Sequence, residues 1–259
     1  MTIISDIVND LTGNIDPRHD GYITASPYFL WGFLLTYIFI IKVLGPKLMR
    51  FRQPYQIKNL LIGYNFIQIL VNTFLVYEAI ILYFSNSNWI CIDTTEKNLL
   101  ADARKHYYYL KILDCVETVF FILRKKYQQA SFLHIYHHAG IVCAAFLAFR
   151  YDYGDAPMIV GSLNALTHVL MYIYYLLSAI DSRWSKYTTI KKSLTLLQIV
   201  QLNVILFSLT IAKLIPGCIS VPTYSLLIWN LQNVFMINLF VRFYIKSYIN
   251  GQKSVGKKN

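Results

Sequence analysis

Three histidines, His134, His137 and His138, occur within five residues of one apolar stretch. Residues at positions i, i+3 and i+4 lie on one face of an α-helix, so this helix would present three imidazoles together. Imidazole can act as a nucleophile, as a general acid or base, or as a metal ligand. Because ionisable side chains are costly inside a membrane, the cluster predicts a functional site rather than a structural polar network between helices.

Further polar side chains lie at similar depths in four other apolar stretches. At about 1.5 Å of rise per residue, they fall roughly 6–18 Å from the same end of their helices. Polar groups that converge on one layer from five helices indicate an enclosed chamber. Beside the three histidines, the residues of this layer are Asn65, Gln68, Glu117, His168, Gln198 and Gln201.

The elements that carry this layer have the length and composition of membrane spans. The chain has 259 residues, of which 56% are hydrophobic and only 14% are charged, and its mean hydropathy is +0.44. Soluble domains carry about 25% charged residues, so this composition excludes a disordered chain and argues against a soluble domain. Since a span takes roughly 17–25 residues, we expect an all-α membrane protein with seven transmembrane helices. The predicted spans are Pro27–Leu44, Leu60–Phe84, Tyr107–Leu123, Ser131–Phe149, Pro157–Ile180, Leu194–Ile215 and Pro222–Ile245.

The charges outside the spans predict the orientation. One side of the membrane would hold 15 basic residues and one acidic residue, whereas the other would hold five basic and nine acidic residues. Basic loops face the cytosol, so we expect residues 1–26 to be a lumenal segment, residues 27–245 a seven-span domain and residues 246–259 a basic cytosolic tail. Orientation and anionic lipid account for the net charge of +11, so no nucleic-acid partner is expected.

Several short motifs, in their order and spacing, resemble the ELO family of very-long-chain fatty acid elongases over nearly the whole chain. The motifs are Gly45 to Met49, Tyr64 to Gln68, Lys111 to Lys126, Phe132 to Ala139, Asn164 to Tyr175, Gln198 with Gln201, and Phe243 to Tyr248. One pair departs from the family pattern, which usually places glutamate at position 114 and aspartate at position 117. This chain has Asp114 and Glu117, so both remain carboxylates but their reach differs by one methylene.

The resemblance implies an enzyme of the endoplasmic reticulum membrane in which six helices enclose an acyl tunnel and the first helix is peripheral. It implies condensation of a long-chain acyl-CoA with malonyl-CoA to give 3-oxoacyl-CoA, CO2 and CoA. Neither a cofactor nor a metal is expected. Beyond the two substrates and the lipid bilayer, the expected partners are the reductases and the dehydratase of the elongation cycle.

Within that reaction, His137 would be the nucleophile that takes the acyl group as an acylimidazole. Asp114 or Glu117 would orient the ring by accepting its other N–H, following the logic of a catalytic triad. His134 and His138 would then act as bases or as further orienting groups.

A second set of residues would handle malonyl-CoA and the CoA moieties. His168 would polarise the malonyl thioester carbonyl as negative charge develops. Neutral amides could stabilise an oxyanion, and a lysine could bind a carboxylate. Two tyrosines could face the chamber, and a run of basic residues could bind the phosphates of CoA. These candidate substrate-binding residues are Lys111, Asn164, Tyr172, Tyr175, Gln198, Gln201, Arg124, Lys125 and Lys126.

Three alternatives remain open. Cys115 is a rival nucleophile, because soluble condensing enzymes commonly use cysteine. His134 and His138 could instead bind zinc or iron. Membrane di-iron oxygenases share this spacing, but they need about eight ligands and the chain has six histidines. The non-enzyme alternative is a transporter or receptor with a polar cavity, although the chain shows no repeated halves.

Two further features concern the lumenal side. Cys91 and Cys218 both fall in predicted lumenal loops, where oxidising conditions permit a disulfide. The lumenal halves of the last three spans are rich in Leu, Ile, Val and Phe. We therefore expect an acyl tunnel that runs from the histidines toward the lumen and whose closed end sets the chain length.

Overall fold

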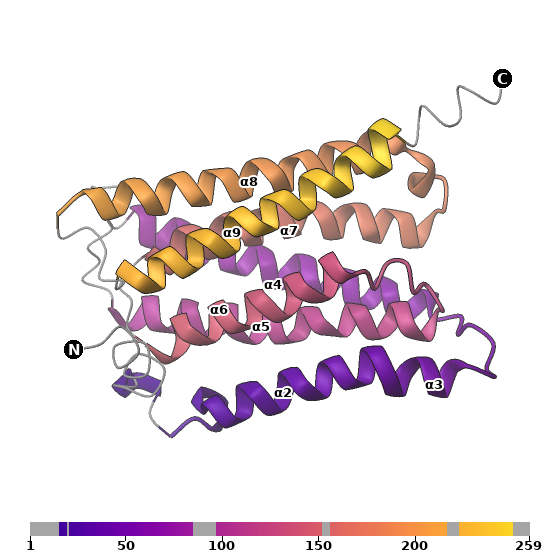
Figure 1. The fold of residues 1–259 in the computed structure, drawn as a ribbon, viewed down its shortest axis with the longest axis horizontal. Coiled ribbons are helices and arrows are strands. Elements are labelled where there is room, and N and C mark those ends of the chain that lie inside the picture. Colours follow the sequence, from indigo (N-terminus) through magenta and orange to yellow (C-terminus); the bar gives the residue numbers. More distant parts are fainter. Residues whose placement is uncertain (1–15, 20, 85–96, 152–155, 217–222, 251–259) are drawn as a thin grey trace.

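The computed structural model describes residues 16–19, 21–84, 97–151, 156–216 and 223–250. Long helices run side by side along the molecule (Figure 1). No β-strand occurs in the described part of the chain. The prediction of an all-α membrane protein is therefore confirmed.

Seven long helical segments make up the fold, and shorter turns join or extend them. The long helices are α2 (Pro27–Phe39), α4 (Lys58–Phe84), α5 (Lys97–Leu123), α6 (Phe132–Arg150), α7 (Ala156–Ile180), α8 (Thr188–Leu214) and α9 (Thr223–Tyr244). The shorter elements are η1 (Pro17–His19), η2 (Ile23–Ala25), η3 (Ile40–Leu44), α3 (Gly45–Met49), η4 (Trp184–Lys186) and η5 (Ile245–Asn250). Of these, η3 and η5 are π-helical turns that continue α2 and α9.

Six of the long helices close into a ring. Going around it, α4 packs on α5, α5 on α6, α6 on α9, α9 on α8, α8 on α7, and α7 back on α4. Each helix thus has a face toward the interior and a face toward the surroundings. The ring provides the enclosed space that the polar layer requires.

The segment formed by α2, η3 and α3 lies at one edge of this ring (Figure 1). It packs chiefly against α5 and α6. Leu30, Leu34 and Ile41 bury its inner side, whereas Trp31 and Leu35 are 60% and 67% exposed on its outer side. The expectation that the first helix is peripheral to the other six is therefore confirmed.

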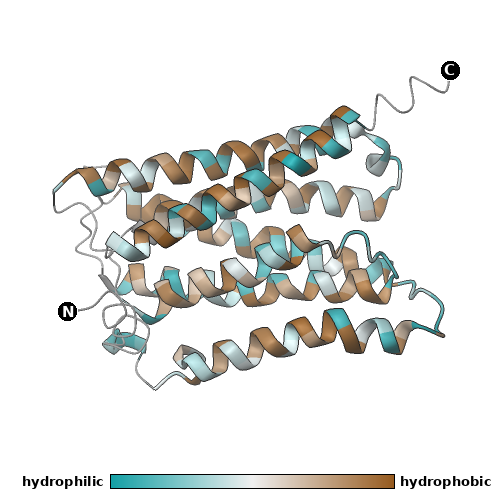
Figure 2. Cartoon of the chain, in the orientation of Figure 1, coloured by the Kyte–Doolittle hydropathy of each residue, from teal (hydrophilic) through white to brown (hydrophobic). Residues whose placement is uncertain are grey.

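Six helical segments have the length and apolar composition of a membrane span, and α5 does not (Figure 2). Lys111, Asp114 and Glu117 lower its hydropathy. Because α5 packs against α3, η3, α4, α6 and α7, its polar side chains can face other helices rather than lipid. Lys111 and Asp114 are completely buried there. This position explains how α5, which has seven charged residues and three of them in its apolar middle, can pack among the six apolar helices.

The helix α5 also begins well before the predicted span. Leu100 is buried against Ala79, Leu82 and Met158, so the added turns pack against α4 and α7. Hydropathy alone marks only the apolar middle of such a helix.

A buried carboxylate anchors the turn that precedes α2. Asp16 accepts hydrogen bonds from the guanidinium groups of Arg18 at 2.6 Å and Arg104 at 3.2 Å. Its backbone N–H donates to the carbonyl of Arg150 at 2.9 Å, and the Arg150 guanidinium donates to the carbonyl of Ala25. The cluster ties η1 and η2 to the start of α5 and the end of α6.

We expect the stability of the protein to depend on pH through His19, which lies in this cluster. Burial lowers the pKa of His19, and although Asp16 opposes this effect, the Arg104 charge adds to it. The unfolded chain, with a pKa of about 6.5, therefore binds the proton first, and stability falls as the pH drops below that value. Between about pH 7.5 and 5.5 the wild-type Tm should fall by about 2–4 °C more than that of His19→Phe. Phenylalanine keeps the ring contact with Phe149, so parallel thermal unfolding curves would contradict this expectation.

Candidate active site

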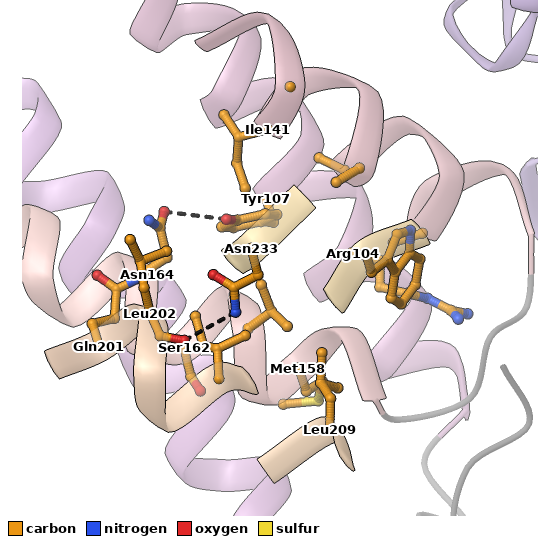
Figure 3. Close-up of a pocket in the computed structure, with 18 of the residues that line it drawn as sticks. Arg104, Tyr107, Ile141, Met158, Ser162, Asn164, Gln201, Leu202, Leu209 and Asn233 are labelled. Carbon is orange, nitrogen blue, oxygen red and sulfur yellow. Dashed lines mark hydrogen bonds between the residues drawn. The ribbon is translucent and has the colours of Figure 1, made fainter. Parts of the chain in front are cut away.

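A mainly apolar cavity of about 160 Å³ lies inside the ring, and all six ring helices contribute to its wall. Figure 3 shows it between Tyr107, Ile141, Asn164, Gln201 and Asn233 near one end and Met158, Leu209 and Arg104 near the other. Small residues on one face of α6 leave the space that it occupies. These residues are Gly140, Ala144, Ala145 and Ala148.

The three histidines of α6 lie together, as their spacing predicts. Ser131 caps the helix by accepting a hydrogen bond from the backbone N–H of His134 at 3.3 Å, which fixes where the first turn begins. The ring centroids of His134 and His138 are 4.3 Å apart, and those of His137 and His138 are 5.6 Å apart. Of these three, only His137 lines the cavity.

His134 is held by hydroxyl groups from two other helices. Its Nε2 lies 3.0 Å from Thr118 Oγ1 on α5, and this oxygen lies 2.9 Å from the Tyr37 hydroxyl on the peripheral helix α2. Tyr37 is 5% exposed, so it reaches into the protein from outside the ring. The chain of three groups fixes the orientation of the His134 ring relative to His138.

We expect Tyr37 to act as a positioning residue through this chain. Tyr37→Phe removes only the hydroxyl, and Thr118→Val removes the hydroxyl that contacts His134. Each should lower kcat by about tenfold, less than the roughly 100- to 10,000-fold contribution of a direct acid–base group, because these hydroxyls act through His134, while KM changes little. Thr118→Ser should restore kcat, because serine keeps the oxygen. Equal losses in Thr118→Ser and Thr118→Val would show that packing, not the hydrogen bond, matters.

A buried polar network stands next to the histidines. Lys111 donates to Asp114 Oδ2 and to Asn164 Oδ1, both at 2.8 Å, and its ammonium lies 5.0 Å from the ring centre of Tyr107. Asp114 Oδ1 accepts from Gln68 Nε2 at 2.9 Å. The exposed fractions of Lys111 and Asp114 are both 0%, so each charge depends on the other and on neutral neighbours. The network joins α4, α5 and α7.

His168 on α7 approaches this network without a hydrogen bond to it. Its Nδ1 lies 3.6 Å from Asp114 Oδ2, beyond ordinary hydrogen-bond distance. Tyr172 packs edge-on against His168 at 5.7 Å and against Tyr64 at 6.0 Å, and Tyr175 packs against Tyr172 at 5.9 Å. Neither tyrosine is among the residues that line the cavity, so they support His168 by packing.

The carboxylates of Asp114 and Glu117, the pair that departs from the family pattern, lie near different histidines. Asp114 stands beside His168, whereas Glu117 lies near His134 and His138. Within the described chain His137 forms ring contacts only, so neither carboxylate orients it in this structure. The expected orienting role of Asp114 or Glu117 toward His137 is thus not seen in the arrangement of these side chains.

Glu117, His134 and His138 also form a group that could hold a metal ion. Their ligand atoms all lie within 4.8 Å of one another. Zinc–ligand distances are near 2.0–2.2 Å, so binding would draw these atoms closer together. Nε2 of His134 already contacts the Thr118 hydroxyl, so binding through this nitrogen, unlike binding through Nδ1, would displace Thr118.

The other predicted site residues divide into two groups. Asn164 and Gln201 line the cavity, whereas Gln198 donates to the Met171 sulfur at 3.0 Å and is not among the lining residues. Arg124 and Lys126 follow the end of α5 without lining the cavity, and Lys125 lies on a groove outside the ring. The predicted pair Cys91 and Cys218 falls outside the described residues.

Cys115, the rival nucleophile, lies away from the cavity. It is 4% exposed and packs in the apolar cluster between α5, α6 and the peripheral helix. Its thiol donates to the carbonyl of Lys111 at 3.6 Å. This position suits a structural thiol rather than a nucleophile for a substrate in the cavity.

Several residues of the site were not predicted from the sequence as site residues. Tyr107 donates to Asn164 Oδ1 at 3.1 Å, and Tyr136 donates to Gln232 Oε1 on α9. Among them, Gln232 could have been predicted from the sequence, because a glutamine inside an apolar membrane span is costly. Tyrosines occur throughout this chain, so no pattern singles out Tyr37 or Tyr107.

Comparison with known proteins places the chain in a family. Residues 22–256 match the model described as the ELO, GNS1/SUR4 family. The chain is 31% identical to very long chain fatty acid elongase 1 of Mus musculus, with 98% of this chain and 93% of that protein covered. It is 33% identical to very long chain fatty acid elongase F of Drosophila melanogaster, over 92% of this chain and 95% of that protein. Since the family match spans nearly the whole chain, the protein belongs to the ELO (GNS1/SUR4) family.

Proposed function

We propose that the protein condenses a long-chain acyl-CoA with malonyl-CoA to form 3-oxoacyl-CoA, CO2 and CoA. The observation that carries the proposal is the position of His137. Alone among the three histidines of α6, it lines an apolar cavity enclosed by six helices. A nucleophile at the wall of an apolar cavity suits transfer of a fatty acyl group.

In the first step, a ring nitrogen of His137 attacks the acyl thioester carbonyl. The C–S bond breaks, the CoA thiolate leaves, and the acyl group stays on the imidazole. The proton released from the other ring nitrogen passes to a neighbouring base and then to the thiolate. His138 suits the role of base, because its Nδ1 has no hydrogen-bond partner in the described structure and its ring is next to His137.

In the second step, malonyl-CoA loses CO2 and the resulting enolate carbon attacks the acylimidazole carbonyl. The C–N bond breaks, 3-oxoacyl-CoA forms, and the imidazolate of His137 takes up one proton from solvent, which balances the proton that left with CoA in the first step. His168 and Lys111 would stabilise negative charge on the thioester oxygen and carboxylate of malonyl-CoA. The apolar wall of the cavity excludes water, which would otherwise hydrolyse the acylimidazole.

The group formed by Glu117, His134 and His138 supports a second candidate, a metal-dependent oxidation or hydrolysis of a lipid substrate. Bound metal would be the central reagent in that case. Metal analysis of the purified protein separates the two candidates. One equivalent of metal that is lost in His134→Ala would favour the second candidate, whereas activity after exhaustive chelation favours condensation.

We propose that the cavity holds the acyl chain and limits its length. It extends from His137 along α6 to Ala148, which is about 16 Å at 1.5 Å per residue, and reaches Met158 on α7. Met158→Ala should therefore shift the products toward longer chains, and Ala148→Phe toward shorter ones. Leu166→Ala on the outer face of α7 is the matched control. Mass spectrometry of the products from an acyl-CoA panel measures both shifts. Identical product lengths in all variants would contradict the proposal that the cavity limits the chain length.

The reaction itself is tested with purified protein in detergent. The protein is incubated with an acyl-CoA panel and labelled malonyl-CoA, and 3-oxoacyl-CoA is measured by mass. Labelled product that requires both substrates supports the proposal. Folded protein that forms no product with any chain length would overturn it.

The surroundings of the enzyme follow from the same proposal. We place the protein in the endoplasmic reticulum membrane, with its C-terminus in the cytosol because the basic loops and tail share one side. The reductases and the dehydratase that process a 3-oxoacyl-CoA would be its partners. A C-terminal tag that is protected from protease in sealed vesicles would contradict the orientation.

A further inference from the structure

A second hollow lies outside the ring, between the peripheral segment and the ring itself. It is an open groove of about 690 Å³ formed by η3, α3, the end of α5 and the connection that leads to α6. Its lining residues are Ile41, Lys42, Pro46, Lys47, Arg50, Ile122, Lys125, Tyr127 and Ala130. Four of these are cationic and none of them is acidic, so the groove attracts an anion.

Two irregular pieces of backbone bring cations to this groove. Lys42 belongs to the π-helical turn η3 in the middle of an otherwise α-helical segment. Lys125 has a φ of 55°, and it is the one non-glycine residue with a positive φ in the described chain. Both conformations are uncommon in proteins and are found disproportionately at functional sites. Here both residues line the same groove, Lys42 from η3 and Lys125 from the connection that follows α5.

The peripheral segment and α5 are held at a fixed separation. A Cβ atom on Gly45 would lie 2.7 Å from Ile122 Cγ2 and 2.8 Å from the carbonyl oxygen of Ile40, so only glycine permits this close approach. The Lys125 ammonium lies 3.5 Å from the carbonyl oxygen of Arg50 and can donate to it across the groove. The groove is therefore part of the packed structure.

We propose that this groove binds the headgroup of an anionic membrane phospholipid with more than one phosphate, such as phosphatidylinositol 4-phosphate. The groove lies at the end of the bundle that carries the basic loops, where anionic lipids of the cytosolic leaflet would meet it. Basic pockets between transmembrane helices on that side hold such headgroups. Val43, Leu48 and Phe51, which are 51–89% exposed, follow the same segment and suit contact with acyl chains.

CoA carries phosphates too, but the position of the groove favours a lipid. No histidine lines the groove, and His137 lines the separate cavity inside the ring. The groove is formed by η3, α3 and the end of α5, outside the ring. The peripheral segment that contributes η3 and α3 lies at the edge of the molecule (Figure 1). A phospholipid reaches this position by lateral diffusion in the membrane.

Native mass spectrometry of the full-length protein tests the proposal. Protein in neutral detergent is titrated with phosphatidylinositol 4-phosphate or with phosphatidylcholine, and bound lipid is counted. The double variant Lys47→Gln/Arg50→Gln removes two exposed cations that have no part in the proposed reaction. It should bind phosphatidylinositol 4-phosphate about 30-fold more weakly, which corresponds to about 1 kcal/mol for each charge. The matched control Lys186→Gln/Lys192→Gln removes two cations from the same predicted side and should bind like the wild type.

Competition with CoA distinguishes the two sources of phosphate. Retention of the lipid at saturating CoA supports a lipid site. Equal weakening in both double variants would reveal attraction to net charge alone and would overturn the proposal. Displacement of the lipid by CoA would overturn it as well, because the groove would then belong to the substrate. None of these measurements depends on catalysis, so their outcome is separate from that of the proposed function.

Discussion

Replacing His137 with alanine is expected to reduce formation of 3-oxoacyl-CoA by at least about 1,000-fold, a lower bound beside the roughly million-fold loss seen when a protease loses its covalent nucleophile. The physical reason is that His137 is the α6 histidine that lines the cavity, so its neighbours cannot replace it without moving the helix. Acyl-CoA supplied without malonyl-CoA should release one equivalent of CoA from the wild type and leave an acyl adduct on the protein. Intact-protein mass spectrometry would detect that adduct.

His19→Phe is the matched control, because it removes an imidazole that does not line the cavity. It should form the adduct and the product like the wild type under conditions in which it is folded. An adduct that persists in His137→Ala would rule out His137 as the nucleophile. An adduct that persists in His137→Ala and disappears in His168→Ala would assign the nucleophile to α7.

The second large effect is expected at the buried pair formed by Lys111 and Asp114. Lys111→Met keeps most of the unbranched side chain but leaves the Asp114 carboxylate, which is 0% exposed, without its cation. Removing one partner of a buried pair costs about 3–5 kcal/mol, so the variant should unfold at a much lower temperature. The double variant Lys111→Met/Asp114→Asn should recover much of this loss, because neither charge is then left alone.

Thermal unfolding and activity, measured on the wild type, Lys111→Met, Asp114→Asn and the double variant, separate structure from catalysis. We expect the stabilities to be strongly non-additive, with an interaction energy of about 1–3 kcal/mol. We expect the double variant to remain inactive although it is folded, since it lacks the charge proposed to hold the malonyl carboxylate. Additive stabilities would show that the pair is not coupled, and full activity in the double variant would remove Lys111 from the proposed mechanism.

Much of the site could be predicted from the spacing of residues along the sequence. The three histidines share a helix face because positions i, i+3 and i+4 always do, whatever the helix packs against. The common depth of His168, Gln201 and the α6 histidines likewise follows from helical rise and from the ends of the spans. The long helices could be predicted because a bilayer demands long apolar helices, and the apolar middle of α5 was recognised in spite of its charges.

What the sequence did not determine is how each helix is rotated about its axis. That rotation decides that His137 lines the cavity while His134 contacts Thr118, and that Asp114 meets Lys111 and not His137. It is set by the packing of all the helices together, which no local pattern records.

The sequence by itself thus determined an all-helical membrane protein with an imidazole cluster at one depth, because length, hydropathy and helical period are local properties. Only the tertiary structure decided which groups touch. It brings Tyr37 from a peripheral helix to the layer of histidines, and it places Lys125 on an outer groove instead of at the cavity. These contacts join residues distant in the chain, and they exist only once the ring has closed and each side chain has one set of neighbours.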